Sequence, residues 1–213
     1  AEAVPGVTAE AVPGAAPPLR APDVPIVLVG MPGSGKTSVG RRLSARYGLP
    51  FLDADAEIEA AAGLPVTEIF SRYGEPHFRD GERRVIARLL AGPPCILATG
   101  GGAFADARTR AAVRASGARS VWLRCTLPVL ERRVAQRSHR PMFVGRDAMT
   151  VLRGLADARH HLYAEADITV DCLDDGPEDT TAKVIAALDA HRPPDRTRVR
   201  LSDRSYDVLA GPG

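Results

Sequence analysis

The chain has 213 residues, with 28 Lys+Arg against 26 Asp+Glu and 45% hydrophobic residues. This is the composition of one ordinary globular domain and excludes a disordered or fibrous chain. The net charge of +2 gives no electrostatic reason to expect a nucleic-acid or membrane-surface protein. No apolar stretch approaches the roughly 18 to 20 residues that span a bilayer. We therefore expect a cytoplasmic protein with no nucleic-acid partner and no membrane partner.

The beginning of the chain has a composition unlike the rest. Residues 1–24 are rich in alanine and proline, and the sequence AEAVPG occurs at Ala1 and again at Ala9. Such a segment cannot bury enough apolar surface to offset the entropy of ordering it. We therefore expect a disordered N-terminal tail over residues 1–24, with the folded domain beginning at residue 25.

From Ile26 onward, short apolar runs alternate with helical patterns. The apolar runs cover residues 26–29, 50–52, 95–99, 120–123 and 168–170. The helical patterns cover residues 38–47, 54–62, 66–73, 75–90, 106–116, 128–135, 148–165 and 177–191. Continuous apolar strands between helices indicate a parallel sheet that is covered on both faces. We expect a doubly wound α/β domain whose ligands bind at the carboxyl ends of the strands.

The first expected strand leads directly into a phosphate-binding motif. The sequence GMPGSGKT at residues 30–37 fits GxxxxGK[ST] at every fixed position. The glycines let backbone N–H groups turn toward phosphate oxygens, and the start of the next helix adds partial positive charge. Lys36 can reach the β- and γ-phosphates, and the Thr37 hydroxyl can bind Mg²⁺. The chain has only one other lysine, Lys183, and a planar guanidinium does not replace the compact ammonium in this loop.

A phosphate loop is shared by GTPases, motor ATPases and small-molecule kinases, so residues on the acceptor side must discriminate among them. Asp53 and Asp55 end the second expected strand with the spacing DxD, which makes them face the same crevice if the segment is extended. One carboxylate can then orient the Mg²⁺ shell while the other accepts a hydroxyl proton. The alternative is a strand-end turn with a helix N-cap.

Two further features follow along the chain. Arg79 lies near the start of a long helical pattern and is either a surface charge or an anion clamp. Gly100, Gly101 and Gly102 follow the third apolar run. Three glycines allow the backbone to press against a flat substrate and to donate N–H groups to it, although a simple turn is the alternative.

Six motifs, in order, resemble the shikimate kinase family. They are GMPGSGKT at 30–37, FLDAD at 51–55, GEPHFR at 74–79, ATGGGA at 98–103, RSHRP at 137–141 and RHHLY at 159–163. The resemblance implies a P-loop, three-layer, doubly wound sandwich of the nucleoside-monophosphate-kinase-like type, with a five-stranded parallel sheet, over residues 25–193. It also implies Mg²⁺-dependent transfer of the γ-phosphoryl group of ATP to the 3-hydroxyl of shikimate.

The resemblance assigns the ATP-binding roles residue by residue. The phosphates would be bound by Gly33, Ser34, Gly35, Lys36, Thr37 and Ser38. Thr37 would hold Mg²⁺, and Asp53 would support that ion through water. Arg133 would lie against the adenine, while Arg140 would reach the phosphates from a polar, arginine-rich lid over residues 136–147.

The resemblance also assigns the acceptor side. Asp55 would hold the substrate hydroxyls and act as the base, so that the expected catalytic residues are Lys36, Asp55 and Arg140. Arg79 and Arg159 would clamp the shikimate carboxylate, which suits their planar, bidentate geometry. Gly101 would contact the substrate through its backbone.

The last segment, residues 194–213, does not belong to the kinase pattern. It alternates like one strand, a turn and a second strand, and it resembles the opening hairpin of 3-dehydroquinate synthase, an enzyme of the same pathway. We hypothesise that the chain is the kinase part of a fusion with that enzyme. By itself such a tail has too few strands to be stable and should be mobile. As an isolated domain, we expect the kinase to be a monomer.

Two other functions remain open from the sequence. A gluconate-type kinase shares the phosphate loop and the acidic strand end, and its acceptor also bears a carboxylate. The glycine turn together with Arg79 and Arg159 argues against that interpretation. The other alternative is a nucleotide-binding domain without catalysis, and the presence of Lys36, Asp53 and Asp55 together argues against it.

Overall fold

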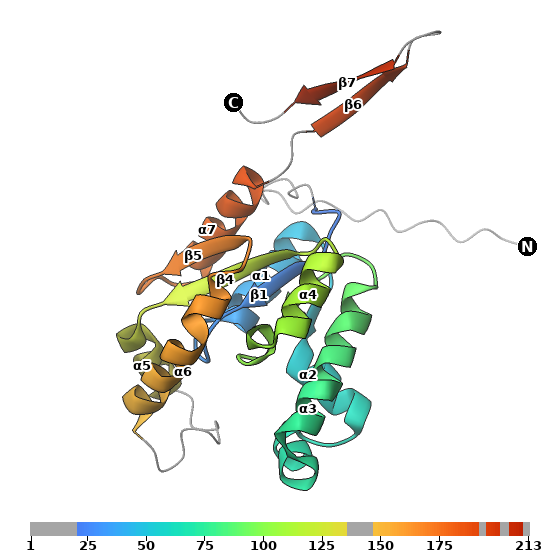
Figure 1. Ribbon diagram of the computed structural model, residues 1–213. Helices are drawn as coiled ribbons and strands as arrows, with labels where there is room; N and C mark the ends of the chain where they lie inside the picture. The colour runs from blue at the N-terminus through green and yellow to red at the C-terminus, as the bar shows by residue number, and fades with distance from the viewer. Residues whose placement is uncertain (1–20, 136–146, 192–194, 201–204, 211–213) are drawn as a thin grey trace, which may run out of the picture.

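The computed structural model describes residues 21–135, 147–191, 195–200 and 205–210 (Figure 1). Most of the tail expected over residues 1–24 therefore lies outside the described residues. Of the lid expected over residues 136–147, only Asp147 is described, where its side chain caps a helix by accepting a hydrogen bond of 2.8 Å from the backbone N–H of Thr150.

Five strands form one sheet in which every pairing is parallel. The strands are β1 (Ile26–Val29), β2 (Phe51–Asp53), β3 (Ile96–Ala98), β4 (Arg119–Cys125) and β5 (Ile168–Cys172). Their order across the sheet is β2-β3-β1-β4-β5, which confirms the expected five-stranded parallel sheet. Because the strand order reverses around β1, the crevice for ligands opens at the carboxyl end of that strand.

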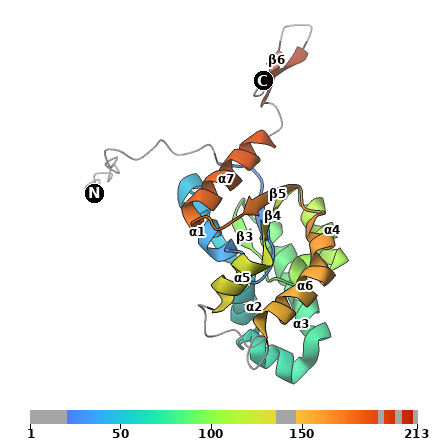
Figure 2. The ribbon, with the colours of Figure 1, turned by 90° about the vertical axis from the view of Figure 1, so that its left-hand side faces the viewer.

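Helices cover both faces of the sheet and give the expected three layers. They are α1 (Lys36–Tyr47), α2 (Ala54–Ala62), α3 (Val66–Leu90), the 3-10 helix η1 (Ala103–Ala105), α4 (Ala107–Ala115), α5 (Leu127–Ala135), α6 (Ala148–Tyr163) and α7 (Pro177–Ala190). Helices α1 and α7 pack together on one face, whereas α3, α4 and α6 lie on the other (Figure 2). Within the described residues, no helix is long and apolar enough to cross a membrane.

The central strand anchors the hydrophobic core. The side chains of Ile26, Val27, Leu28 and Val29 are fully buried, and burying each contributes about 1.5–3 kcal/mol. Helix α1 packs closely against the sheet, since a Cβ added at Gly40 would lie 2.5 Å from the Phe51 ring. The loop that follows β1 therefore begins from a rigid base.

Helix α3 consists of two helical parts that meet at Gly74, which is where the two expected helices, 66–73 and 75–90, are separated. Gly74 has the non-helical φ of 78° inside the element, a conformation that glycine adopts without a steric penalty. The bend brings Phe70 before it and Phe78 after it into a stack, with ring centroids 4.4 Å apart. The second part of α3 carries Arg79, so this bend helps to place that residue.

The C-terminal segment forms the expected pair of strands. Strands β6 (Asp195–Arg200) and β7 (Ser205–Ala210) are antiparallel, with Asp195 opposite Ala210. This confirms the hairpin that the alternating pattern predicts. The relation of the hairpin to 3-dehydroquinate synthase stays a hypothesis.

Candidate active site

The phosphate loop connects β1 to α1, and three of its glycines set its course. Gly30, Gly33 and Gly35 have φ values of 143°, 87° and 96°, which residues with side chains rarely adopt. Gly35 is the N-cap of α1 and supplies no side-chain hydrogen bond, and the first turn of that helix has no acidic residue. The N-terminal N–H groups of α1 are therefore available to an anion.

Lys36 is held against the loop that it follows. Its Nζ atom donates hydrogen bonds to the carbonyl oxygens of Gly30 at 2.8 Å and Met31 at 3.1 Å. The ammonium group thus adds a full positive charge next to the partial charge of the helix terminus. Together these groups make an electropositive site for phosphate groups.

Thr37 and Asp53 bring oxygen ligands to the same place. The Thr37 hydroxyl donates to Asp53 Oδ2 at 3.3 Å. Among the described residues there is no group of three or more His, Cys, Asp or Glu that could hold a metal ion. Mg²⁺ does not require one, because it is usually bound by one or two protein oxygens together with waters and substrate phosphates. Thr37 and Asp53 fit this kind of site.

The acidic pair does not lie on one extended segment as expected. Asp53 ends β2, whereas Asp55 lies in the first turn of α2. The reason is local, since the Asp53 Oδ1 atom accepts a hydrogen bond of 3.2 Å from the Asp55 backbone N–H and so caps the new helix. The N-cap alternative is thus correct for Asp53. Both carboxylates nevertheless line the same small cavity beside the phosphate loop.

A second cavity lies on the other side of the phosphate loop, with a volume of about 200 Å³. Its lining residues are Gly33, Ser34, Gly35, Ser38, Val39, Arg133, Asp175, Pro177 and Thr180. Arg133 is fixed there because its Nη2 atom donates to the Asp175 carbonyl oxygen at 3.0 Å. Arg133 therefore lines a cavity next to the phosphate loop, and its expected contact with adenine stays a prediction. Arg140, by contrast, lies outside the described residues.

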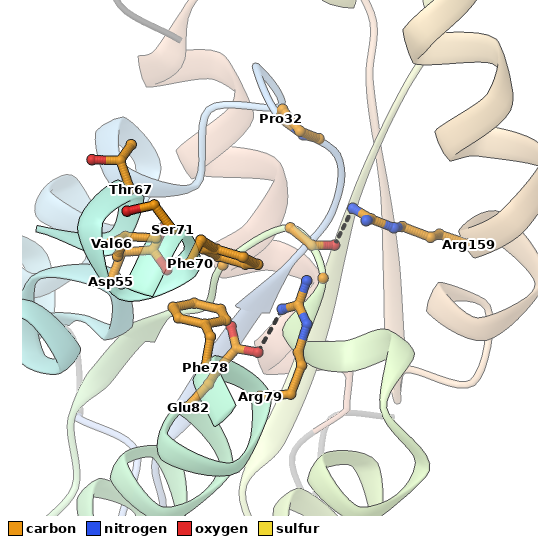
Figure 3. Close-up of a pocket in the computed structure, with 13 residues that line it drawn as sticks. Pro32, Asp55, Val66, Thr67, Phe70, Ser71, Phe78, Arg79, Glu82 and Arg159 are labelled. Carbon is orange, nitrogen blue, oxygen red and sulfur yellow. Dashed lines mark hydrogen bonds and ion pairs between the residues drawn. The ribbon is translucent and has the colours of Figure 1, made fainter. Parts of the chain in front are cut away.

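The largest of these cavities, about 760 Å³, opens on the other side of Asp55 (Figure 3). It is lined by Pro32, Asp55, Val66, Thr67, Phe70, Ser71, Phe78, Arg79, Glu82, Gly100, Gly101, Gly102 and Arg159. Phe70 and Phe78 give it an apolar wall, while the two arginines reach it from different helices, α3 and α6. An apolar wall facing cationic groups suits a small ring that carries a carboxylate.

Arg79 is held by two carboxylates on its own helix. Its Nη1 atom donates to Glu82 Oε2 at 2.6 Å (Figure 3). Its Nη2 atom donates to Glu75 Oε1 at 3.2 Å. Burial acts to lower the pKa of Arg79, but Glu82 and Glu75 outweigh it and raise that pKa. Arg79 is thus a fixed cation, and the surface-charge alternative is wrong because its side chain is only 25% exposed and lines the cavity.

Glu82 is the partner that holds Arg79 from within the core. Its side chain is only 2% exposed. Burial raises the pKa of Glu82, and the Arg79 guanidinium opposes that effect. Its second oxygen, Oε1, accepts no hydrogen bond from the part of the chain that the structure describes. The sequence alone indicated no role for Glu82. Its position three residues after Arg79 is the signal for a pairing, because residues with this spacing lie on one face of a helix.

Each glycine of the turn after β3 makes room for a different group of the site. A Cβ at Gly100 would lie 2.7 Å from Asp55 Oδ1, and one at Gly102 would lie 2.5 Å from Arg79 Nη2. At Gly101 the nearest atoms would belong to Pro32 of the phosphate loop at 3.3 Å and to Arg159 at 3.6 Å. A simple turn does not require these three approaches, so the glycines serve the packing of the site.

Arg159 reaches the same turn from α6. Its Nη1 atom donates to the Gly101 carbonyl oxygen at 3.1 Å (Figure 3). Arg79 and Arg159 thus lie against adjacent glycines of the turn, which the sequence alone could only suggest. Both guanidinium groups line the large cavity, where they can meet one anionic group.

Asp55 belongs to both the large cavity and the small cavity at the phosphate loop. Burial raises the pKa of its carboxyl group, and the nearby charge of Asp53 raises it further, while Lys36 acts in the opposite direction. Its side chain is still open to solvent through the cavities. A carboxyl group that lies between two cavities and has a raised pKa is suited, in its ionised form, to accept a proton.

The parallel sheet carries a phosphate loop after its central strand, and the cavity at that loop shares the Asp55 carboxylate with the acceptor cavity. This combination defines the class of P-loop kinases that phosphorylate small molecules. Comparison with known proteins narrows that class. The family model for shikimate kinase matches residues 32–189. The chain therefore belongs to the shikimate kinase family, which consists of ATP-dependent phosphotransferases.

Individual relatives agree with this assignment. The chain is 53% identical to shikimate kinase from Paramagnetospirillum magneticum over 163 residues, which are 76% of this chain and 83% of that one. It is 56% identical to shikimate kinase from Caulobacter vibrioides over 157 residues, covering 74% and 77% of the two chains. Among solved structures, shikimate kinase from Acinetobacter baumannii in complex with shikimate has a TM-score of 0.74 at 33% identity, covering 79% of this chain and 95% of that one.

Proposed function

We propose that this chain transfers the γ-phosphoryl group of ATP to the 3-hydroxyl of shikimate in a Mg²⁺-dependent reaction that yields shikimate 3-phosphate and ADP. One observation carries the proposal: Asp55 lies between the cavity at the phosphate loop and the cavity that holds Arg79 and Arg159. A phosphoryl donor and a carboxylate-bearing acceptor can therefore meet at a single base.

The acceptor would be held by its carboxylate and its ring. Arg79 and Arg159 offer planar groups of N–H donors, and a carboxylate can bind such groups with two parallel hydrogen bonds. Because Glu75 and Glu82 already hold Arg79 in place, little side-chain entropy is lost when the acceptor binds. The apolar wall of Phe70 and Phe78 would face the carbon ring, and Gly101 would approach the acceptor through its backbone.

The transfer itself needs alignment and charge stabilisation more than covalent catalysis. The 3-hydroxyl oxygen forms a bond to the γ-phosphorus as the bond from that phosphorus to the β,γ-bridging oxygen breaks, and ADP leaves. The hydroxyl proton passes to the Asp55 carboxylate. Lys36 and the N-terminus of α1 stabilise the negative charge that develops on the phosphate oxygens.

The metal site follows from the phosphate loop. Mg²⁺ would be held by the Thr37 hydroxyl and, through water, by Asp53, and when bound it would neutralise charge on the β- and γ-phosphates. The hydrogen bond between these two side chains keeps both oxygens at the loop. Arg133 would lie against the adenine, and Arg140 of the lid would complete the phosphate site.

A three-way acceptor assay tests the proposal. ADP release is measured with ATP and Mg²⁺ in the presence of shikimate, of gluconate and of neither, and the product is identified by phosphorus NMR. We expect ADP release that depends on shikimate and a phosphate ester at the 3-hydroxyl. Release that gluconate supports equally well would favour the gluconate-type kinase, and release independent of either acceptor would contradict acceptor phosphorylation.

We also propose that the isolated kinase domain is a monomer. The described residues that we expect to contact ATP, Mg²⁺ or shikimate line cavities within a single copy of the chain. Sedimentation velocity at the concentration used for the assay tests this expectation. A dimer whose dissociation abolishes turnover would contradict it.

A further inference from the structure

Tyr163, at the end of α6, shares a hydrogen-bond acceptor with Arg159. The Tyr163 hydroxyl donates to the Gly101 carbonyl oxygen, and Arg159 Nη1 donates to the same oxygen at 3.1 Å. The two donors are four residues apart, so they lie on one face of the helix. The turn that lines the acceptor cavity is thus held by two groups, of which only Arg159 lines that cavity.

Tyr163 is placed rigidly in the core. Its side chain is fully buried, and its ring centroid lies 5.9 Å from that of Trp122 on β4. Burial raises the pKa of the Tyr163 hydroxyl, with Arg159 opposing the effect, so the group stays a protonated donor at neutral pH. A buried hydroxyl is destabilising unless it is hydrogen-bonded, which ties the phenol to the glycine turn.

The arrangement gives Tyr163 a task that Arg159 cannot perform alone. If the Arg159 guanidinium turned toward an acceptor carboxylate, its hydrogen bond to the Gly101 carbonyl oxygen would weaken. The Gly101 backbone is also close to Pro32 of the phosphate loop, where an added Cβ would lie 3.3 Å away. A rotation of this peptide would therefore disturb the boundary between the two cavities unless a second donor held its oxygen.

We propose that Tyr163 is a positioning residue that holds the Gly101 carbonyl, so that the glycine turn keeps its shape while Arg159 engages the acceptor carboxylate. This inference rests on the proposed function. It predicts a defect chiefly in acceptor binding, because Tyr163 lines neither the cavity at the phosphate loop nor the cavity beside Arg133. An interaction of this kind affects KM more than kcat.

Tyr163→Phe tests the proposal, because phenylalanine keeps the ring and its packing and removes only the hydroxyl. We expect the KM for shikimate to rise about fivefold, as for the loss of one buried hydrogen bond. The KM for ATP and the kcat should each stay within about twofold. Tyr47→Phe is the matched control, since Tyr47 is also a buried tyrosine but ends α1, the helix whose other end meets the phosphate loop.

A readout without turnover separates this inference from the proposed function. In the ligand-free protein, Tyr163→Phe should shift the amide NMR signals of Gly101 and Gly102, whereas Tyr47→Phe should leave them unchanged. Unaltered glycine signals together with an unaltered KM would overturn the positioning role, as would equal rises in the KM for both substrates. If the wild-type chain does not phosphorylate shikimate, the proposed function fails whatever the glycine signals show.

Discussion

The phosphate side and the acceptor side of the proposed site are built in different ways. The described part of the phosphate side is mainly one continuous segment, residues 30–38, in which backbone groups and a helix terminus would bind the phosphates. The acceptor side is assembled from separate elements, which contribute Asp55, Arg79, residues 100–102 and Arg159. The phosphate side therefore depends on local conformation, whereas the acceptor side depends on how α3, α6 and the glycine turn pack together.

This difference implies that the two sides can be damaged independently. Changes to the phosphate loop should affect ATP and the chemical step. Changes to the acceptor side should affect shikimate binding and leave ATP binding intact. The acceptor cavity shares no lining residue with the cavity beside Arg133, and only Pro32, Asp55, Gly100 and Gly101 with the cavity at the phosphate loop. The following substitutions test this separation, beginning with the largest expected effect.

Lys36→Met tests the phosphate side. We expect kcat to fall about 10³-fold, because a charge directed at the transferring phosphoryl group is lost. The fold should remain, since the Lys36 ammonium bonds to carbonyl groups of the loop and its side chain is not among the buried core residues. The matched control is Lys183→Met at the other lysine, which is exposed on α7 and ion-paired with Asp175. Turnover by Lys36→Met within tenfold of wild type would contradict the assignment.

Arg79→Lys tests the acceptor side. Lysine keeps the charge but loses the planar group of donors, so we expect the KM for shikimate to rise about 10- to 100-fold with little change in the KM for ATP. Arg159→Lys should behave alike. Arg72→Lys is the control, because Arg72 is an exposed arginine on the same helix. Equal losses for shikimate and ATP would show that Arg79 is structural.

Gly102→Ala tests the packing that joins Arg79 to the glycine turn. The added methyl group would lie 2.5 Å from Arg79 Nη2, so the guanidinium must move. We expect shikimate affinity, measured by calorimetry, to fall about tenfold, as overpacking of this kind is destabilising by about 1–3 kcal/mol. Gly81→Ala on α3 meets no atom within 4 Å and should leave affinity unchanged. Normal affinity in Gly102→Ala would contradict this packing role.

The acid limb of the pH profile tests the state of Asp55. Burial and Asp53 raise the pKa of this carboxyl group, and the base must be ionised to accept a proton. As the pH falls through that raised pKa, kcat should therefore decline at a pH above the ordinary aspartate value. Asp53→Asn removes one of the charges that raise the pKa of Asp55. The inflection of its kcat-against-pH curve, measured with both substrates saturating, should therefore move to lower pH. An inflection that stays in place would exclude Asp55 as its source.

The phosphate side could be predicted from the sequence because its geometry is local. Consecutive residues after a buried strand fix where Lys36 and Thr37 lie, and the glycine pattern allows the required backbone conformation. The parallel sheet could likewise be predicted from continuous apolar runs such as residues 26–29. The prediction that Asp53 and Asp55 lie on one extended segment was wrong, because the sequence pattern does not reveal that Asp53 caps α2 and starts the helix there.

The acceptor side could not be derived from the residues by themselves. From the sequence, Arg79 could be either a surface charge or an anion clamp. The packing of α3 against the glycine turn decides between them, and it also shows that Glu82 is the buried partner of Arg79. The need for glycine at position 102 likewise arises from contact with another element. Resemblance to a family supplied Arg79 and Arg159, whereas Tyr163, which was visible in the motif RHHLY, had no role without its contact with Gly101.

We propose that donor and acceptor meet at Asp55, and Asp55→Asn is the substitution that tests this arrangement. We expect Mg-ADP and shikimate still to bind, with dissociation constants within about fivefold of wild type, while phosphoryl transfer falls about 10³-fold. Because the raised pKa means that the ionised carboxylate destabilises the fold at neutral pH, the midpoint of thermal unfolding should not decrease. Transfer by Asp55→Asn at a rate near that of wild type would show that Asp55 is not the base.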